Sequence, residues 1–165
     1  MMNKICVFSV CFNEEDMLPF YLDYYINFVK VDKIVIYDGD STDNTHEILK
    51  QYPQVELIIQ KQDGQNDQYL KDTKNNSWKK YKDDYDWVIV CDIDEFLYHP
   101  NIQEKLSEYK NNGISIPITK GYDMITLNFP EFIKGNYLPN IITRGISDNH
   151  WMGKKIIFDP QKIEE

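Results

Sequence analysis

Residues 87–100 read WVIVCDIDEFLYHP, an uncharged apolar run that ends in three closely spaced carboxylates. The run at 87–91 has the length and the β-branched content of a strand that is buried on both faces. Asp92, Asp94 and Glu95 follow it at once. Carboxylates this close repel one another unless a cation lies among them. The sequence therefore predicts a buried strand that leads directly into a cation site.

The chain before this run alternates between strand and helix patterns. Short apolar runs predict strands at 4–10, 33–37, 55–60 and 87–91. Apolar spacing and turn residues predict helices at 14–29, about 42–51, 66–80 and 101–110. Strand–helix–strand repeats form parallel sheets, so we expect an α/β fold: a mostly parallel, Rossmann-like sheet flanked by helices, in a single domain.

The two ends of this pattern are less regular. Pro19 predicts that the first helix starts late or has a distorted first turn. After Gly113 the alternation weakens. Short apolar runs there predict further strands at 114–119, 141–144 and 155–158.

Composition and charge exclude several classes of protein. The 165 residues carry a net charge of −9, and 42% of them are apolar. This size and composition are typical of one globular domain. So acidic a chain is a poor binder of nucleic acids or of anionic membranes. If the ligand carries phosphate, we expect a metal ion to mediate the contact.

The cysteines and the first apolar run indicate where in the cell the protein is expected. Cys6, Cys11 and Cys91 form no CxxC pair, so we expect buried free thiols in a reducing compartment. The run at 5–12 is too short to span a membrane and lacks the features of a signal peptide. We therefore expect a cytoplasmic protein without a transmembrane segment; peripheral association with a membrane stays open.

Parallel sheets bind ligands beyond the carboxyl ends of their strands, which selects the residues just after each strand as candidates. Asp92 and Asp94 are spaced so that both can approach one hard divalent cation, Mn²⁺ or Mg²⁺, which leaves room for water and a substrate phosphate. Such an ion would stabilise a diphosphate leaving group. The alternative is that Asp92 caps the next element and Asp94 faces solvent.

Two further segments follow strands. An acidic side chain in 38–43, DGDSTD, can accept hydrogen bonds from a base or a ribose, but a turn with a helix cap explains the same letters. For 12–15, FNEE, the acidic first turn of a helix is the simpler interpretation. His46, His99 and His150 do not cluster, and we expect His46 on a helix face.

Taken together, these segments resemble the family 2-like glycosyltransferases of GT-A fold. The resemblance rests on FNEE at 12–15, DGDSTDNT at 38–45 and DIDEF at 92–96. GYDM at 121–124 and GKKIIFDP at 153–160 also resemble that branch, so the similarity spans nearly the whole chain. It implies metal-dependent transfer of a sugar from a nucleotide diphosphate sugar, with a UDP-sugar favoured, to a saccharide, lipid or protein acceptor, with inversion.

The resemblance also implies roles for individual residues. The nucleotide-binding residues that it implies are Asn13, Glu14, Asp38, Asp40 and Asp92. Asp92 would lie near the ribose and the metal, and Asp94 would be the direct ligand of Mn²⁺ or Mg²⁺.

In this interpretation residues 1–100 form the nucleotide-sugar-binding half and residues 101–165 the acceptor half. An inverting enzyme needs a carboxylate base on the acceptor hydroxyl, and Asp123 and Asp148 are the candidates, with Asp148 preferred. Relatives often continue from the last segment into a further strand and a histidine that completes the metal site. Three interpretations stay open: an acceptor half truncated at its carboxyl end, a minimal enzyme, or an enzyme with weakened metal binding.

Two alternatives stay open. Residues 88–94, VIVCDID, resemble the start of a haloacid-dehalogenase-like phosphatase, in which Asp92 would be the nucleophile. Such enzymes usually carry Thr or Val where this chain has Phe96, and three strand–helix units precede the motif here. A non-catalytic nucleotide-sugar-binding domain is the second alternative, and the missing histidine favours it.

Overall fold

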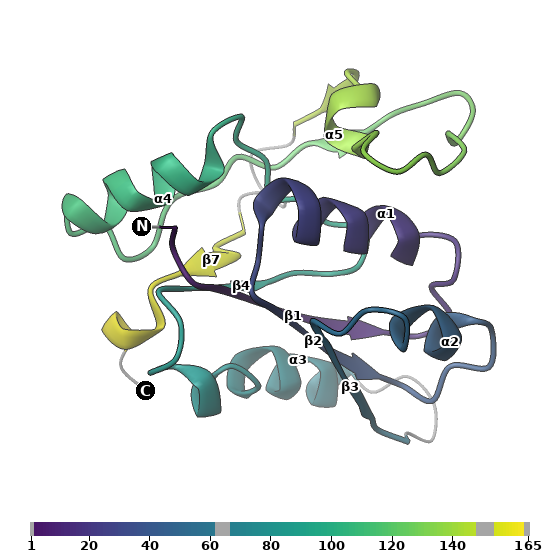
Figure 1. Ribbon diagram of the computed structural model, residues 1–165, viewed down its shortest axis with the longest axis horizontal. Helices are drawn as coiled ribbons and strands as arrows, with labels where there is room; N and C mark the ends of the chain where they lie inside the picture. Colours follow the sequence, from purple (N-terminus) through teal and green to yellow (C-terminus); the bar gives the residue numbers. More distant parts are fainter. Residues whose placement is uncertain (1, 62–66, 148–153, 164–165) are drawn as a thin grey trace.

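A five-stranded sheet forms the centre of the computed structural model, which describes residues 2–61, 67–147 and 154–163 (Figure 1). Its strand order is β3-β2-β1-β4-β7. The strands are β1 (Ile5–Cys11), β2 (Lys33–Asp38), β3 (Val55–Ile59), β4 (Trp87–Val90) and β7 (Ile157–Phe158). The first four are parallel and β7 is antiparallel to β4. This confirms the predicted mostly parallel sheet.

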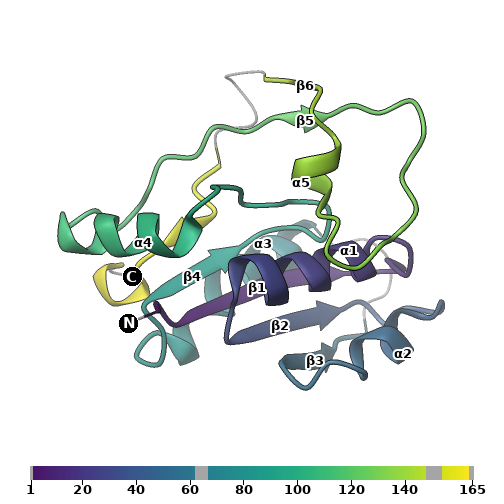
Figure 2. The same cartoon turned by 45° about the horizontal axis from the view of Figure 1, so that its top comes forward.

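Helices cover both faces of the sheet (Figures 1 and 2). One face carries α1 (Leu18–Asp23), the π-helix Tyr24–Val29 that continues it, α2 (Thr45–Leu49) and α4 (Ile102–Asn111). The other face carries α3 (Asp67–Asn76) and the short 3-10 helix Lys79–Tyr81. The predicted α/β domain, with helices on both sides of one sheet, is therefore confirmed.

Burial on both faces explains why the strands read as continuous apolar runs. In β1, Ile5 and Val7 point to the face covered by α1, whereas Cys6 and Phe8 point to the face covered by α3. All four side chains are at most 1% exposed. Because side chains alternate across the strand, successive residues of β1 are buried on opposite faces of the sheet, and apolar side chains suit all four positions.

The first helix begins late, as predicted. Pro19 stands in its first turn, where the missing N–H costs nothing, and regular helix begins only at Leu18. The turn before it is closed by the carbonyl of Glu14, which accepts from the backbone N–H of Met17 at 3.1 Å. The π-helix that continues it ends at Val29, and its cap, Lys30, adopts a left-handed φ of 62°.

Two strand predictions in the second half are wrong. Residues 114–119 form no strand, and 141–144 begin with the last residue of a short helix, α5 (Leu138–Ile141), and form no strand either. The 114–119 run pairs with no neighbouring strand, and Ile118 is 92% exposed. Apolar residues without a partner strand do not form a ladder, whatever their propensity. The run at 155–158 does form β7, over Ile157–Phe158 only.

A small outer layer completes the described fold. It holds the two-stranded sheet of β5 (Asp123–Met124) and β6 (Gly145–Ile146), together with α5. This layer arches over α1 in Figure 2 and is anchored to it by Phe20, whose ring packs edge-on against Phe132 at 5.2 Å between centroids. The final 3-10 helix, Pro160–Lys162, follows β7. None of the helices within the described residues has both the length and the apolar character that a bilayer crossing demands.

Candidate functional site

The carboxyl ends of the parallel strands meet at one edge of the sheet. Cys11 of β1 pairs with Asp38 of β2, which pairs with Ile59 of β3. The chain leaving β4 joins the same edge, because the N–H of Cys91 donates to the carbonyl of Phe8 in β1 at 3.1 Å. The segments 12–15, 38–43 and 92–95 therefore lie beside one another, as the sequence predicts.

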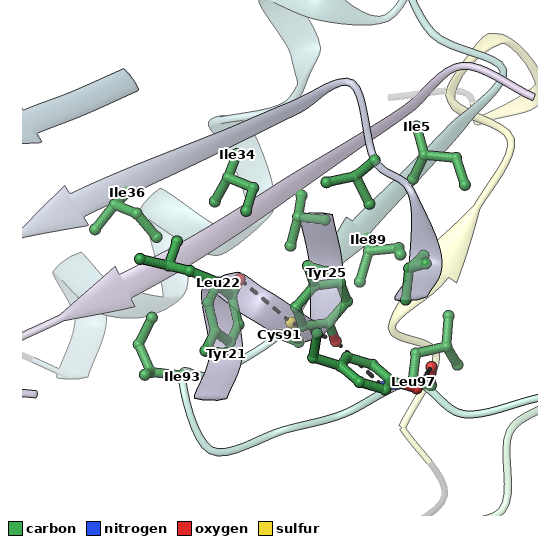
Figure 3. Close-up of a cluster of buried hydrophobic side chains, with 14 of the residues drawn as sticks. Ile5, Tyr21, Leu22, Tyr25, Ile34, Ile36, Ile89, Cys91, Ile93 and Leu97 are labelled. Carbon is green, nitrogen blue, oxygen red and sulfur yellow. Dashed lines mark hydrogen bonds between the residues drawn. The ribbon is translucent and has the colours of Figure 1, made fainter. Parts of the chain in front are cut away.

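Two buried tyrosines fix the segment after β4. The Tyr25 hydroxyl donates to the carbonyl of Glu95 at 3.0 Å and accepts from the N–H of Leu97 at 3.2 Å. The Tyr24 hydroxyl donates to the carbonyl of Leu97 at 2.8 Å. Tyr25 also lies 3.4 Å from the sulfur of Cys91 (Figure 3). The π-helix that continues α1 thus fixes the position of the acidic segment through these hydrogen bonds.

The spacing of the acidic motif turns its carboxylates outward. Ile93 is 2% exposed and lies in the buried cluster of Figure 3, so the residues on either side of it face the opposite way. Asp92 is partly exposed and Asp94 is exposed. Burial raises the pKa of Cys91, just before them, to about 12, so this thiol stays neutral. The three cysteines are free and buried, as expected.

Two lysines bracket Asp92. Lys74, on α3, forms an ion pair with Oδ1 of Asp92. Lys154, just before β7, lies 3.8 Å from Oδ2 of Asp92 and also pairs with Glu95. Glu95 in turn accepts from the N–H of Asp92 at 3.1 Å. Positive charge among these carboxylates is therefore supplied by the chain itself, which the sequence interpretation did not foresee.

A cavity of about 670 Å³ adjoins this ion-pair network. Its charged wall includes Lys74, Asp92, Glu95 and Lys154. Apolar side chains also line the cavity, among them Trp78 of the chain after α3, Val90 of β4 and Phe158 of β7. The acidic motif thus borders a space large enough for a small ligand.

The turn after β2 is built around a buried carboxylate. Asp38 is 0% exposed. Its Oδ1 accepts from the N–H of Ser41 at 2.8 Å and contacts Nε2 of His46 at 2.7 Å, and its Oδ2 accepts from the Ser41 hydroxyl at 2.6 Å. The hydrogen bonds to Asp38 close this segment on itself, but the residue that caps α2 is Asn44, one position beyond the segment in which the sequence suggested a cap. A base could reach the Asp38 carboxylate only by replacing one of these partners.

The segment after β1 is tied to that turn. The N–H of Asn13 donates to the Ser41 hydroxyl at 2.8 Å, and its side-chain oxygen accepts from the N–H of Thr42 at 2.8 Å. Asn13 has a left-handed φ of 55°, which asparagine tolerates better than most residues. These bonds hold two loops in one fixed arrangement at the sheet edge.

Glu15 acts on α2 rather than on its own helix. Its Oε2 accepts from the N–H of Asn44, the residue that caps α2, at 2.9 Å. Its own N–H donates to Asp43 at 3.1 Å. The first turn of α1 contains no acidic residue. The interpretation of 12–15 as an acidic first helical turn is therefore wrong, because Pro19 delays the helix and leaves both glutamates in the loop.

The acidic groups at this edge influence one another. Burial first, and then the charges of Asp94, Asp43 and Asp92, raise the pKa of Glu14 above its ordinary value. The contributing charges come from the segments after β2 and β4, whereas Glu14 follows β1. This edge is thus a concentration of negative charge, which a bound cation would stabilise.

We expect Glu14→Gln to stabilise the protein at pH 7, in a metal-free buffer. Because the folded pKa of Glu14 is raised, stability falls as the pH rises from the unfolded value, about 4.3, through the folded value. A neutral side chain removes that loss, for a gain of less than about 1 kcal/mol at this partly exposed site. Urea unfolding at pH 7 and pH 3.5 measures it.

The matched control for this change is Glu131→Gln, because Glu131 is exposed in the outer layer. It should leave the free energy of unfolding unchanged at both pH values. At pH 3.5 the Glu14 variant and the wild type should be equally stable, since the glutamate is then protonated in both states. An equal gain at both pH values would contradict the assigned repulsion.

The donor set suits a hard divalent cation that substrate oxygens complete. Asp92 and Asp94 supply carboxylate oxygens at the exposed edge, and Mg²⁺ or Mn²⁺ commonly uses one or two such carboxylates with water and phosphate. Within residues 2–61, 67–147 and 154–163, no three His, Cys, Asp or Glu side chains gather into a complete site.

Of the remaining candidates, Asp40 lies at this edge, in the segment after β2, and the others lie elsewhere or outside the described residues. Asp123 is exposed on β5, in the small outer sheet. Asp148, the preferred base, lies outside the described residues, as does His150. Asp40 has a left-handed φ of 70° and lies 3.3 Å from Lys61. His99 accepts from the N–H of Asn101 at 3.1 Å and makes a local turn.

Sequence reasoning missed Lys74, Lys154 and the role of His46. His46 lies on α2, as expected, but its ring reaches back to Asp38, eight positions earlier. Lys154 stands in the GKKIIFDP segment, so a signal for it was present. Lys74 lies in a polar helix among other lysines, and nothing in that pattern distinguishes it.

Comparison with known proteins identifies a family. The model of glycosyltransferase family 92 matches residues 4–165. The motifs predict a family 2-like branch of the glycosyltransferases. The family match supports the wider class of glycosyltransferases but not that branch. No curated protein matches the chain.

Solved structures give weaker likenesses. TarS 1-349 from S. aureus has a TM-score of 0.49 and 16% identity, over 79% of this chain and 38% of TarS 1-349. A mannosyltransferase from Pyrobaculum calidifontis, solved with GDP-Man and Mn²⁺, has a TM-score of 0.43 and 16% identity, over 64% of this chain and 32% of its own. The chain thus spans about a third of the length of these structures, and at such scores we infer no substrate from them.

Proposed function

This chain belongs to glycosyltransferase family 92, and on that premise we propose that it binds a nucleotide diphosphate sugar and transfers the sugar to an acceptor. The observation that carries the proposal is the meeting of three polar segments at the carboxyl edge of the sheet. They are 12–15, 38–43 and 92–95, and this is where open α/β sheets hold their ligands. We propose a UDP-sugar as donor.

The proposed metal ligand is Asp94, with Asp92 beside it. A bound Mn²⁺ or Mg²⁺ would neutralise the diphosphate and so favour its departure. Asp94 suits this role because it is exposed and lies on a segment that Tyr24 and Tyr25 hold in place. Positioning of this kind lowers the reorganisation needed when the ligand binds.

The proposed nucleoside contacts come from the linked loops. Asn13 and Glu14 follow β1, and Asp40 lies partly exposed in the segment after β2. Asp38 supports these loops from within, because its carboxylate accepts from Ser41, whose hydroxyl in turn accepts from Asn13. A base or ribose would thus meet a surface whose backbone is already ordered.

The acceptor side of the proposal rests on the sequence. We propose an inverting reaction in which a carboxylate takes the proton of the acceptor hydroxyl, with Asp148 preferred over Asp123 as that base. The acceptor would be a saccharide, a lipid or a protein. The buried free thiols fit a reducing compartment, so we propose a cytoplasmic location.

A thermal-shift panel tests donor binding. UDP, GDP, TDP and CDP are each added with Mn²⁺ or with EDTA. A ligand at about 100 times its dissociation constant stabilises the native state by about 2.7 kcal/mol, which raises the melting temperature of a chain of this size by roughly 5–10 °C. We expect UDP with Mn²⁺ to give the largest shift. No shift with any nucleotide would contradict the proposal.

A further inference from the structure

Lys74 and Lys154 converge on Asp92 from distant parts of the chain. Lys74 lies on α3, and Lys154 precedes β7, 80 positions later in the sequence. They reach opposite oxygens of one carboxylate, Oδ1 and Oδ2. Two ammonium groups therefore lie at the border between the acidic motif and the adjoining cavity, and both belong to its wall.

Both lysine side chains are partly exposed to solvent. The side chains of Lys74 and Lys154 are 34% and 53% exposed. Each ammonium has three N–H donors, and ion pairs this open contribute little to stability. The hydrogen bond to Glu95 raises the pKa of Lys154, so it stays cationic at neutral pH. Both groups can thus exchange a carboxylate for a ligand oxygen at small cost.

The surrounding charge shows why such donors are needed. The chain has a net charge of −9, and Glu14, Asp92, Asp94 and Glu95 gather at this edge. A diphosphate that approached Asp92 with one divalent cation as its only positive partner would still face several carboxylates. Lysine ammonium groups are common phosphate ligands in proteins.

We propose that Lys74 and Lys154 form a lysine clamp that binds the diphosphate of the donor directly, alongside the divalent cation. This inference rests on the proposed function, since it assigns a subsite for the diphosphate of that donor. The clamp holds phosphate oxygens at the mouth of the cavity next to Asp92. Diphosphate binding accordingly persists, more weakly, when the metal is removed.

Inorganic pyrophosphate in EDTA tests the clamp without a nucleoside or a metal. Isothermal titration calorimetry compares the wild-type chain with Lys74→Met and Lys154→Met. Charged hydrogen bonds of this kind account for about tenfold in affinity or more, so we expect each variant to bind pyrophosphate about tenfold more weakly. The affinity for uridine, which has no phosphate, should not change.

The matched control is Lys110→Met. Lys110 forms an ion pair with Asp86 whose side chains are 40% and 33% exposed, close to the 34% and 34% of Lys74 and Asp92. That pair lies at the amino end of β4, opposite the site. Lys110→Met makes the same change in charge and should bind pyrophosphate within about twofold of the wild type.

A second variant separates a direct contact from simple neutralisation of Asp92. If Lys154 acts only by cancelling the charge of Asp92, then Asp92→Asn combined with Lys154→Met restores pyrophosphate affinity. If the clamp contacts phosphate, the double variant stays weak. Restored affinity would therefore overturn the proposal, as would pyrophosphate binding that is absent in EDTA or equal in Lys154→Met and Lys110→Met.

These outcomes are distinct from failure of the proposed function. Nucleotide binding that requires Mn²⁺, with no pyrophosphate binding in EDTA, would remove the clamp and leave the donor site. Pyrophosphate binding that depends on both lysines, with no preference for any nucleotide, would keep the clamp and remove the proposed donor.

Discussion

Asp94→Asn should weaken binding of a nucleoside diphosphate in the presence of Mn²⁺ by about 100-fold, equivalent to about 2.7 kcal/mol. An amide replaces the charged oxygen that would contact the cation, and hard cations bind neutral amides less well than carboxylates. The fold should persist, because Asp94 is exposed in the turn that follows β4. Its loss also relieves repulsion with Glu14, so the melting temperature should not fall.

Calorimetric titration with UDP in Mn²⁺ measures this effect. The control is Asp83→Asn, which removes the same charge from an exposed position before β4, at the opposite edge of the sheet. It should bind as the wild type does. If Asp94→Asn and Asp83→Asn bound the metal–nucleotide equally well, Asp94 would not be a metal ligand.

Asp38→Ala should destabilise the protein by about 3 kcal/mol, the second large effect. The change leaves the N–H and hydroxyl of Ser41 and the ring of His46 without their acceptor, in a site that is 0% exposed. Buried donors without partners cost about 1–3 kcal/mol each, and relaxation of the turn recovers part of that. Urea unfolding followed by circular dichroism gives the free energy of unfolding.

Asp40→Asn is the control for this prediction, two positions further along the same turn, because asparagine tolerates the left-handed φ of 70° at this position. Asp40 is partly exposed and pairs only weakly with Lys61, so its loss should change the free energy of unfolding by less than about 1 kcal/mol. A similar small change for Asp38→Ala would show that the turn does not depend on its buried carboxylate.

The sheet could be predicted because its signal is local. Runs such as 87–91 are apolar at every position, which is the pattern expected of a parallel strand that is covered on both faces. The outer layer could not be predicted in this way. Residues 114–119 have the composition of a strand, but a strand forms only where a partner lies alongside, and the sequence of the segment does not specify one.

Some of the site residues could likewise be predicted from the sequence, and others could not. The acidic motif and the two loops were identified because they follow strands, and the topology of the sheet brings such residues together. The lysines were missed because their role arises only from tertiary contact: Lys74 and Lys154 meet Asp92 across the sheet edge. The repulsion between carboxylates led us to expect one bound cation, whereas the chain already provides two cationic side chains there.

Paramagnetic broadening by Mn²⁺ tests the central claim most directly, that a metal–nucleotide binds at the carboxyl edge of the sheet. Amide signals of the isotope-labelled protein are recorded with UDP as substoichiometric Mn²⁺ is added. We predict that signals from 13–15, 39–43 and 92–95 broaden first, while those of α4 persist. Broadening that centres elsewhere, or that does not require UDP, would contradict this account.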